Sequence, residues 1–271
     1  MAPLKFTNRQ LLASGLGCAG RRVSLWLPVP RSRSLASKHE FYRSMSFLNT
    51  LKNQAQATAA EQQGNASLVA RNTQLVEGAC KEALAYFHTL SQQLNVLKPN
   101  SAGRHALDKQ TVFRALPQMN FRVDARRIEK GSKAQAVEVY DHVVIHWELH
   151  GGGDVELNKD FPPDIEKLEP RLRQSGAKVD VEAQRDTGGG KLLNMRYRFP
   201  ALFLASVRLV PRHEEGLVTF KLMNLDDFDT VWATLPAAEV SAARLDDLAR
   251  WIVGQPHRFL DGAQHVRRVE P

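Results

Sequence analysis

Apolar and polar residues between Ser67 and Leu97 recur with the period of an amphipathic helix. From Val76 onward the apolar positions are separated by steps of four and three residues, so they fall on one narrow stripe. Pro99 is expected to end this helix, because proline has no N–H group to donate. We call the stripe the seam; its members are Val76, Cys80, Ala83, Phe87, Leu90, Leu94 and Leu97.

The pattern changes to strict alternation after Thr111, which is typical of half-buried strands. One such segment runs from Met119 to Arg126. A second runs from Ala136 to His150 and places Val143, Ile145, Trp147 and Leu149 on one face. Four further strands are predicted at 178–184, 192–199, 202–210 and 217–222. The short connections and their turn residues favour antiparallel neighbours.

Three shorter helices complete the predicted elements. One begins at Pro162 and another at Asp226, where Phe228, Val231 and Trp232 have helical spacing. The third begins at Ser241 and carries Leu245, Leu248, Ile252 and Val253. The pattern therefore predicts an α+β fold: an antiparallel sheet of about six strands, with a long N-terminal amphipathic helix and C-terminal helices on one face.

The seam is too apolar to remain in water. Each large side chain that is buried contributes roughly 1.5–3 kcal/mol. Two arrangements satisfy this requirement: the seam lies on the sheet of its own chain, or it pairs with the seam of a second copy.

Three segments are expected along the chain. Residues 1–44 form a basic, disordered extension, residues 45–98 a helical segment with a break at Gly64 and Asn65, and residues 99–271 the sheet domain. The extension holds eight Lys or Arg residues and one acid, as organelle transit peptides do. Alternatively, the native chain begins at Met45 and the upstream residues are a wrong start, which is the interpretation that we favour.

Net charge and hydropathy predict which partners the chain lacks. The formal charge is +8, of which residues 1–44 carry +7, so the remaining body carries +1. A nearly neutral body lacks the net charge that drives phosphate binding, and we predict no nucleic-acid partner. No apolar run approaches the roughly 18 residues that span a bilayer, which predicts no membrane partner.

Cysteine use favours a reducing compartment. Cys80 is the one thiol of the body, so the body cannot form a disulfide within itself. We predict a cytoplasmic protein, with targeting to an organelle by residues 1–44 as the alternative.

The best candidate for chemistry is the trio His146, Glu148 and His150. On a strand these side chains share a face, and two imidazoles with a carboxylate are familiar ligands of transition metals. The two histidines are, however, about 13 Å apart on a regular strand, too far for one metal ion without a bulge. The simpler interpretation is the solvent face of an antiparallel strand.

Other motifs are interpreted structurally. The run Gly188 to Lys191 resembles the end of a phosphate-binding loop but lacks the following Ser or Thr, and indicates a hairpin turn. The acids Asp226, Asp227 and Asp229 lack the spacing of a calcium loop, and helix capping accounts for two of them. His257 and Arg258, beside Phe259, are interpreted as a polar segment after the last helix rather than as a site.

These observations predict a non-enzymatic binding or interaction protein that uses the seam helix and the sheet. No cofactor is predicted, and the expected partner is a second copy or another protein bound through the seam. The alternative is a metal-assisted enzyme that uses His146, Glu148 and His150.

Overall fold

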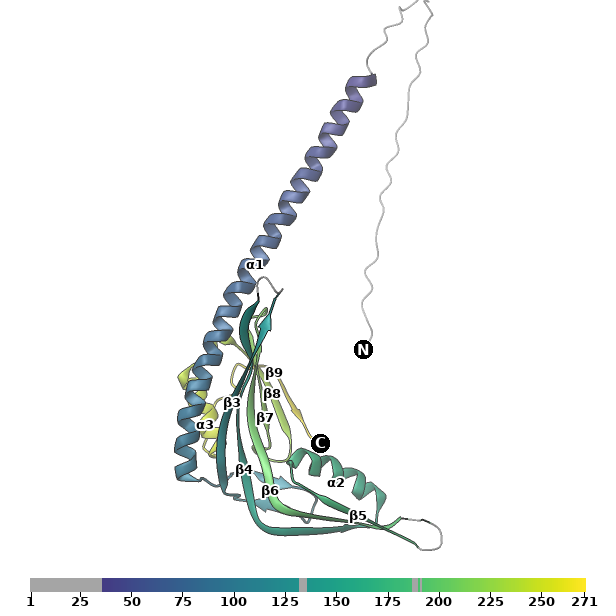
Figure 1. Cartoon of the computed structure of the whole chain (residues 1–271), viewed down its shortest axis with the longest axis vertical. Helices are drawn as coiled ribbons and strands as arrows, with labels where there is room; N and C mark the ends of the chain where they lie inside the picture. Colours follow the sequence, from purple (N-terminus) through teal and green to yellow (C-terminus); the bar gives the residue numbers. More distant parts are fainter. Residues whose placement is uncertain (1–35, 132–135, 187–189, 191) are drawn as a thin grey trace, which may run out of the picture. The chain divides into compact units, whose positions relative to one another are not determined.

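The structure is a computed structural model that describes residues 36–131, 136–186, 190 and 192–271, with side chains from Phe47 onward. The chain divides into two compact units, residues 1–57 and 58–271. The described part of the first unit is helical. The second unit contains every strand and the remaining helices (Figure 1).

The long helix α1 runs from Ala36 to Leu97 and corrects two predictions. Residues 36–44 were predicted to be disordered but are helical, because residues 31–63 contain neither glycine nor proline. The predicted break at Gly64 and Asn65 is also wrong. A glycine inside a helix costs about 1 kcal/mol, which the helical residues on either side of it outweigh.

The other elements follow in chain order. They are β1 (Arg104–Ala106), β2 (Val112–Arg114), β3 (Gln118–Lys130), β4 (Val137–Lys159), α2 (Pro162–Ser175), β5 (Asp180–Arg185), β6 (Leu192–Arg212), β7 (Leu217–Met223), β8 (Thr230–Pro236), the 3-10 turn η1 (Ala237–Glu239), α3 (Ala242–Ile252) and β9 (Gln264–Val269).

The main sheet has seven strands, all paired antiparallel, in the order β3-β4-β6-β7-β8-β9, with β5 beside β6. The strand β6 has two halves with different neighbours. Its first half pairs with β5, and its second half pairs with β7. A separate hairpin consists of β1 and β2. The predicted α+β class with a large antiparallel sheet is confirmed.

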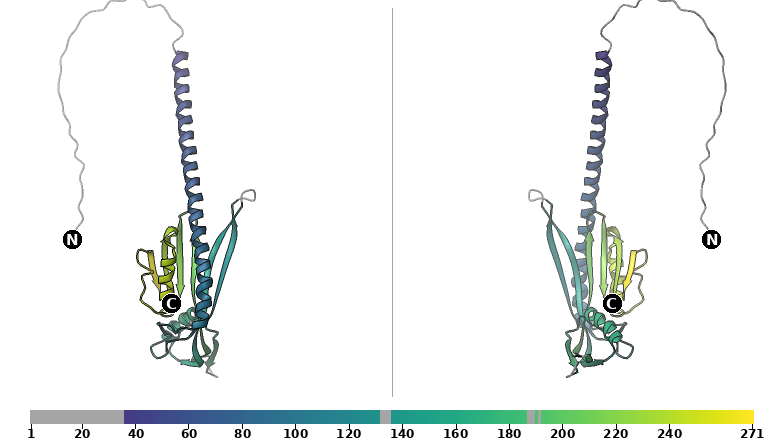
Figure 2. Two further views of the ribbon diagram at one scale, coloured as in Figure 1. Left: turned by 90° about the vertical axis from the view of Figure 1, so that its left-hand side faces the viewer. Right: turned by 90° about the vertical axis from the view of Figure 1, so that its right-hand side faces the viewer.

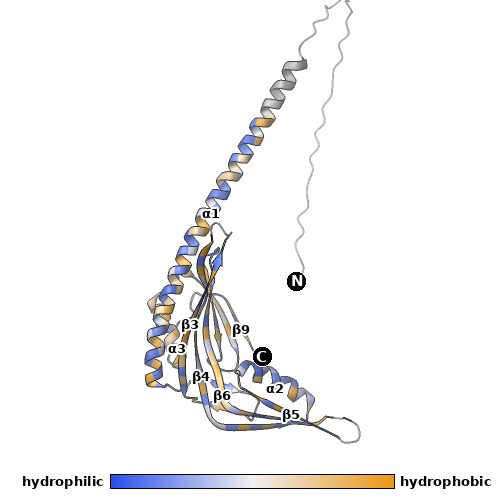
Figure 3. Ribbon diagram, viewed as in Figure 1, coloured by the Kyte–Doolittle hydropathy of each residue, from blue (hydrophilic) through white to orange (hydrophobic). Residues whose placement is uncertain are grey.

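The helices α1 and α3 cover one face of the sheet, which we call the covered face (Figure 2). Apolar side chains of α1, α3 and the strands form one continuous core, and apolar and polar positions interleave along these elements (Figure 3). The two helices are also joined directly, because the Tyr86 hydroxyl donates a 2.6 Å hydrogen bond to Asp246.

The seam lies on the covered face. Six of its seven members are buried within a single chain, and the last member, Leu97, is 72% exposed. Of the two arrangements expected from the sequence, the chain therefore adopts the one in which the seam packs on its own sheet. This burial removes the exposed surface on which the prediction of a homodimer through the seam rested.

Polar contacts fix α1 against the sheet at both ends of the buried stretch. Near its end, the Asn95 side chain donates to the Phe121 carbonyl at 2.9 Å and accepts from the Phe121 N–H at 2.8 Å. One residue after the seam begins, Glu77 accepts a 2.8 Å hydrogen bond from the Tyr140 N–H. The Glu77 carboxylate also lies 3.1 Å from His213 and 3.2 Å from Arg127.

Three elements near the ends of the sheet domain differ from the prediction. Residues 230–236 form strand β8 rather than a helix, and β9 and the β1–β2 hairpin were not predicted. The helical spacing of Phe228, Val231 and Trp232 was misleading. Phe228 belongs to a loop that is closed by a 3.0 Å hydrogen bond from the Asn224 N–H to the Asp229 carbonyl.

Within the described residues, no helix is both long enough and apolar enough to cross a lipid bilayer.

Removing the largest seam side chain should destabilise the folded chain. Phe87 is fully buried, so Phe87→Ala should lower the free energy of unfolding by about 3–5 kcal/mol, measured by urea denaturation. Phe47 is also on α1 but is 63% exposed, so Phe47→Ala should change stability by less than about 0.5 kcal/mol. Equal effects of the two substitutions would contradict the packing of the seam.

Candidate binding face of the sheet

The face of the sheet opposite α1 and α3, which we call the open face, is covered at one end only. There α2 packs against it: Gln174 donates a 2.9 Å hydrogen bond to the Thr230 hydroxyl, and Gly176 lies against Leu204. Beyond this end, no described helix lies on the open face (Figure 2). Side chains there are consequently accessible to a partner.

A row of cations crosses four strands of the open face. Arg208 on β6 lies directly opposite Lys221 on β7, Lys221 lies opposite Trp232 on β8, and Trp232 lies opposite Arg267 on β9. These four positions share one face because directly opposed residues of a sheet point the same way. We call Arg208, Lys221, Trp232 and Arg267 the cationic row.

The cations of the row have no acidic counterpart. Arg208, Lys221 and Arg267 form no ion pair with any described residue. On β6 and β7 the nearest outward neighbours are uncharged, namely Ser206, Val210, Thr219 and Met223. Like charges directly opposite each other on a sheet are destabilising, so the pair of Arg208 and Lys221 lowers the stability of the fold.

Trp232 contributes an aromatic surface to the row. It is partly buried, and the Lys221 ammonium lies 5.2 Å from the centre of its ring. A cation at this distance is attracted by the negative face of the indole. The attraction offsets part of the repulsion between Lys221 and Arg208. Lys221 thereby occupies one face of the Trp232 ring.

His146, Glu148 and His150 of β4 lie on the same open face, beside the cationic row, but they form separate pairs. His146 lies 3.8 Å from Asp124 on β3, whereas His150 lies 3.0 Å from Glu148. Asn120 donates a 2.6 Å hydrogen bond to Glu148. This bond, together with His150, holds the pKa of Glu148 below its usual value.

No three-residue group of metal-ligating side chains occurs among the residues that the structure describes. The structure therefore does not bring His146, Glu148 and His150 together as one ligand set. All three side chains are partly exposed on the open face of β4.

The acidic residues Asp226, Asp227 and Asp229, after β7, connect the β1–β2 hairpin, α3 and β9 through hydrogen bonds and ion pairs. Asp227 accepts 2.8 Å hydrogen bonds from the Ala106 and Phe228 N–H groups. Asp226 accepts from the Trp251 indole at 2.9 Å. Arg268 joins Asp226 at 3.2 Å and Asp229 at 3.1 Å.

These contacts occupy the three carboxylates, so they do not form a cation site. The predicted role of helix capping is also wrong, because strand β8 and not a helix follows these residues. Asp229 is 4% exposed, and its burial raises its pKa to about 6 although Arg268 opposes the shift.

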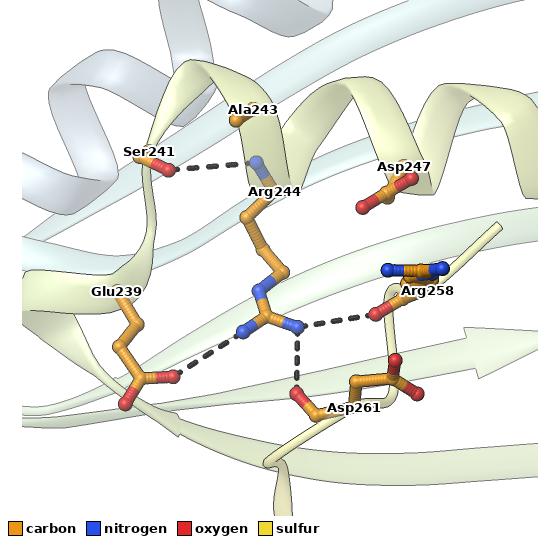
Figure 4. Close-up of a pocket in the computed structure, with 7 residues that line it drawn as sticks. All are labelled: Glu239, Ser241, Ala243, Arg244, Asp247, Arg258 and Asp261. Atoms are coloured by element: carbon orange, nitrogen blue, oxygen red, sulfur yellow. Dashed lines mark hydrogen bonds and ion pairs between the residues drawn. The ribbon is translucent and has the colours of Figure 1, made fainter.

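The polar segment after α3 contains a shallow cavity of about 450 Å³ (Figure 4). Arg244 lies in its wall and donates to the carbonyls of Phe259 at 3.0 Å and Asp261 at 2.7 Å. The guanidinium therefore clamps the segment to α3. His257 stacks on Trp251, with 4.6 Å between ring centres. These contacts support the structural interpretation of His257 and Arg258.

Two further candidates from the sequence are the glycine-rich run and Cys80. Of the glycine-rich run from Gly188 to Lys191, all but Gly190 lies outside the described residues; the run connects the antiparallel strands β5 and β6. Cys80 is fully buried in the seam, and this burial raises its pKa to about 12. A thiol that stays protonated is a poor nucleophile.

Sequence reasoning missed the cationic row. Its residues come from four strands, and only the register of the sheet places them side by side. Two of those strands, β8 and β9, were not predicted, so the row had no signal in a strand-by-strand analysis. Alternation alone correctly placed Val143, Ile145, Trp147 and Leu149 on the covered face.

Comparison of the chain with protein-family models, with curated proteins and with solved structures gives no match.

Reversing one charge of the row should stabilise the protein. Arg208→Glu replaces a repulsive pair with an attractive one opposite Lys221, which should raise the free energy of unfolding by about 0.2–1 kcal/mol in urea denaturation. Arg208→Gln removes the repulsion without adding attraction and should give a smaller gain. A loss of stability in both variants would contradict the repulsion between Arg208 and Lys221.

The raised pKa of Asp229 should make stability fall as pH rises. The folded chain binds this proton more tightly than the unfolded chain, whose pKa is near 3.8, so the contribution is complete below about pH 4 and is lost as pH passes 6. Asp229→Asn should reduce the fall in unfolding free energy between pH 4 and pH 6.5 by about 1–2 kcal/mol. An unchanged pH profile would show that Asp229 titrates normally.

Proposed function

We propose that this chain is a non-enzymatic binding protein whose cationic row receives an extended acidic segment of a partner protein. The observation that carries the proposal is a set of three cations that form no ion pair with any described residue and lie on an accessible sheet face. Proteins keep such a repulsive arrangement at functional sites, where a local rule is broken for the sake of a partner.

The dimensions of the row fit a short extended peptide. Arg208 and Arg267 are separated by three strand spacings, which is about 14 Å. An extended chain advances about 3.3 Å per residue and places alternate side chains on one side. Three acidic residues at alternate positions therefore span about 13 Å and match the length of the row.

The proposed partner is a protein rather than a nucleic acid for two reasons. The body carries a net charge of only +1, which gives little of the long-range attraction typical of nucleic-acid binding. The row offers a single aromatic ring, and Lys221 already lies over it, whereas proteins that bind single strands stack successive bases on several rings.

The contacts of the histidines on β4 do not favour the alternative of a metal-assisted enzyme. The pairing of His146 with Asp124 and of His150 with Glu148 separates the two histidines into different contacts.

Binding of a labelled peptide tests the proposal. A peptide of eight Ser–Glu repeats should bind the full chain at low salt, followed by fluorescence anisotropy. Replacing both Arg208 and Arg267 with Gln should weaken this binding about tenfold, since an exposed ionic contact contributes up to roughly 1 kcal/mol.

A matched control separates the row from general charge. Arg71 and Lys81 are exposed cations of α1, so their replacement with Gln removes the same charge elsewhere and should change affinity less than twofold. Residues 1–44 are present in every variant, so their charge cancels in the comparison. Equal losses in the two double variants would contradict the cationic row as the site. Tighter binding of an oligothymidine with eight phosphates would contradict a protein partner.

A further inference from the structure

A second positively charged site lies apart from the cationic row, in a pocket between the β1–β2 hairpin and α2. The pocket has a volume of about 460 Å³, within the range of small-molecule sites. Residues 107–110 of the hairpin form one wall, and residues 164–171 of α2 form part of the opposite wall. Apolar atoms of the lining provide an apolar surface, and Leu107 and Leu168, each only 1% exposed, lie beneath it.

The hairpin wall is held in place by Asp108. Its carboxylate accepts hydrogen bonds from the N–H groups of Gln110 at 2.8 Å and Thr111 at 2.6 Å. The same carboxylate forms a 2.8 Å ion pair with Lys159, at the end of β4. These contacts lower the pKa of Asp108 to about 2. The negative charge of Asp108 is thus used within the wall and is not available to neutralise a ligand site.

The remaining cations of the pocket, Lys109, Lys167 and Arg171, have N–H groups that can donate hydrogen bonds to a ligand. Lys109 and Lys167 form no ion pair with a described residue. Among the described residues of the lining, which also include Pro271, Asp164 is the only carboxylate side chain besides Asp108. Arg171 donates one hydrogen bond, of 3.1 Å, to the Ala106 carbonyl. Its guanidinium has four further N–H donors.

The positions of these cations favour one compact anionic group. Lys167 and Arg171 are four residues apart on α2, so they lie one above the other on the same side of the helix. Lys109 belongs to the opposite wall. Three cations that line one pocket from two walls suit the several oxygens of a phosphate dianion.

We propose that this pocket binds a small organic phosphate monoester. Lys109, Lys167 and Arg171 hold the phosphate, and apolar atoms of the lining contact the organic substituent. This inference is independent of the proposed protein partner, because the pocket and the cationic row share no residue.

Titration of the full chain with phenyl phosphate tests the assignment. Calorimetry should detect binding below 1 mM, and the amide resonances of residues 107–111 and 164–171 should shift. Inorganic phosphate should bind more weakly, because it lacks a substituent to contact the apolar part of the lining. Benzoate has the same ring but a single carboxylate, and should bind at least tenfold more weakly than phenyl phosphate.

Charge reversal in the pocket provides the decisive comparison. Lys109→Glu combined with Lys167→Glu should weaken phenyl phosphate binding at least tenfold, and both side chains are exposed, so the fold should persist. Lys81→Glu combined with Lys178→Glu makes the same charge change at exposed positions elsewhere and should alter affinity less than twofold. Replacement of Arg208 and Arg267 should leave this binding unchanged even if the proposed protein partner fails its own test.

Four outcomes would overturn the assignment: no heat and no resonance shift up to 10 mM phenyl phosphate, shifts confined to residues outside the pocket, equal affinity for benzoate, or equal losses in the two charge-reversal variants. Resonance shifts are measured on the unaltered chain, so they decide the question even if the Lys109 and Lys167 variant fails to fold.

Discussion

Burial of the seam against the sheet is the contact on which the rest of the structure depends. Val76, Phe87 and Leu94 share one core with the inward side chains of the strands. A sheet with alternating strands has one apolar face, and α1 and α3 occupy it together. Because this face is used within the chain, the opposite face is the one that remains for partners.

Polar contacts give this apolar packing a defined register. An apolar stripe alone allows a helix to slide along a sheet, because the hydrophobic effect has no direction. Glu77 and Asn95 prevent this, since each must meet particular backbone groups, those of Tyr140 and Phe121. Glu77 is partly buried beside His213 and Arg127, and its removal would leave His213 without its carboxylate and Arg127 paired with Glu138 alone among the described residues. The position of α1 is therefore set by directional contacts.

Patterns of apolar residues along the sequence correctly predicted the features that depend on interactions between residues close together in the chain. The seam and the alternation from Met119 to Leu149 were read correctly, because each depends on neighbours a few residues away. The helix expected at Phe228 failed because loop contacts from Asn224, Asp227 and Arg268 overrode a helical spacing of apolar residues. The cationic row depends on the pairing of strands far apart in the chain, and no spacing along the sequence encodes it.

Net charge conceals this arrangement for a related reason: a sum over the body hides how charge is distributed. A body of +1 contains three cations along one row that have no ion pair with a described residue, and three others that line one pocket. The two arrangements suit the two different proposed ligands, because a row about 14 Å long needs a ligand with spaced charges, whereas cations around one pocket need charge concentrated on one centre. Outside these two sites, carboxylates form hydrogen bonds or ion pairs with histidines, backbone N–H groups and Arg268. The separation of these roles lets a nearly neutral chain present two distinct cationic surfaces.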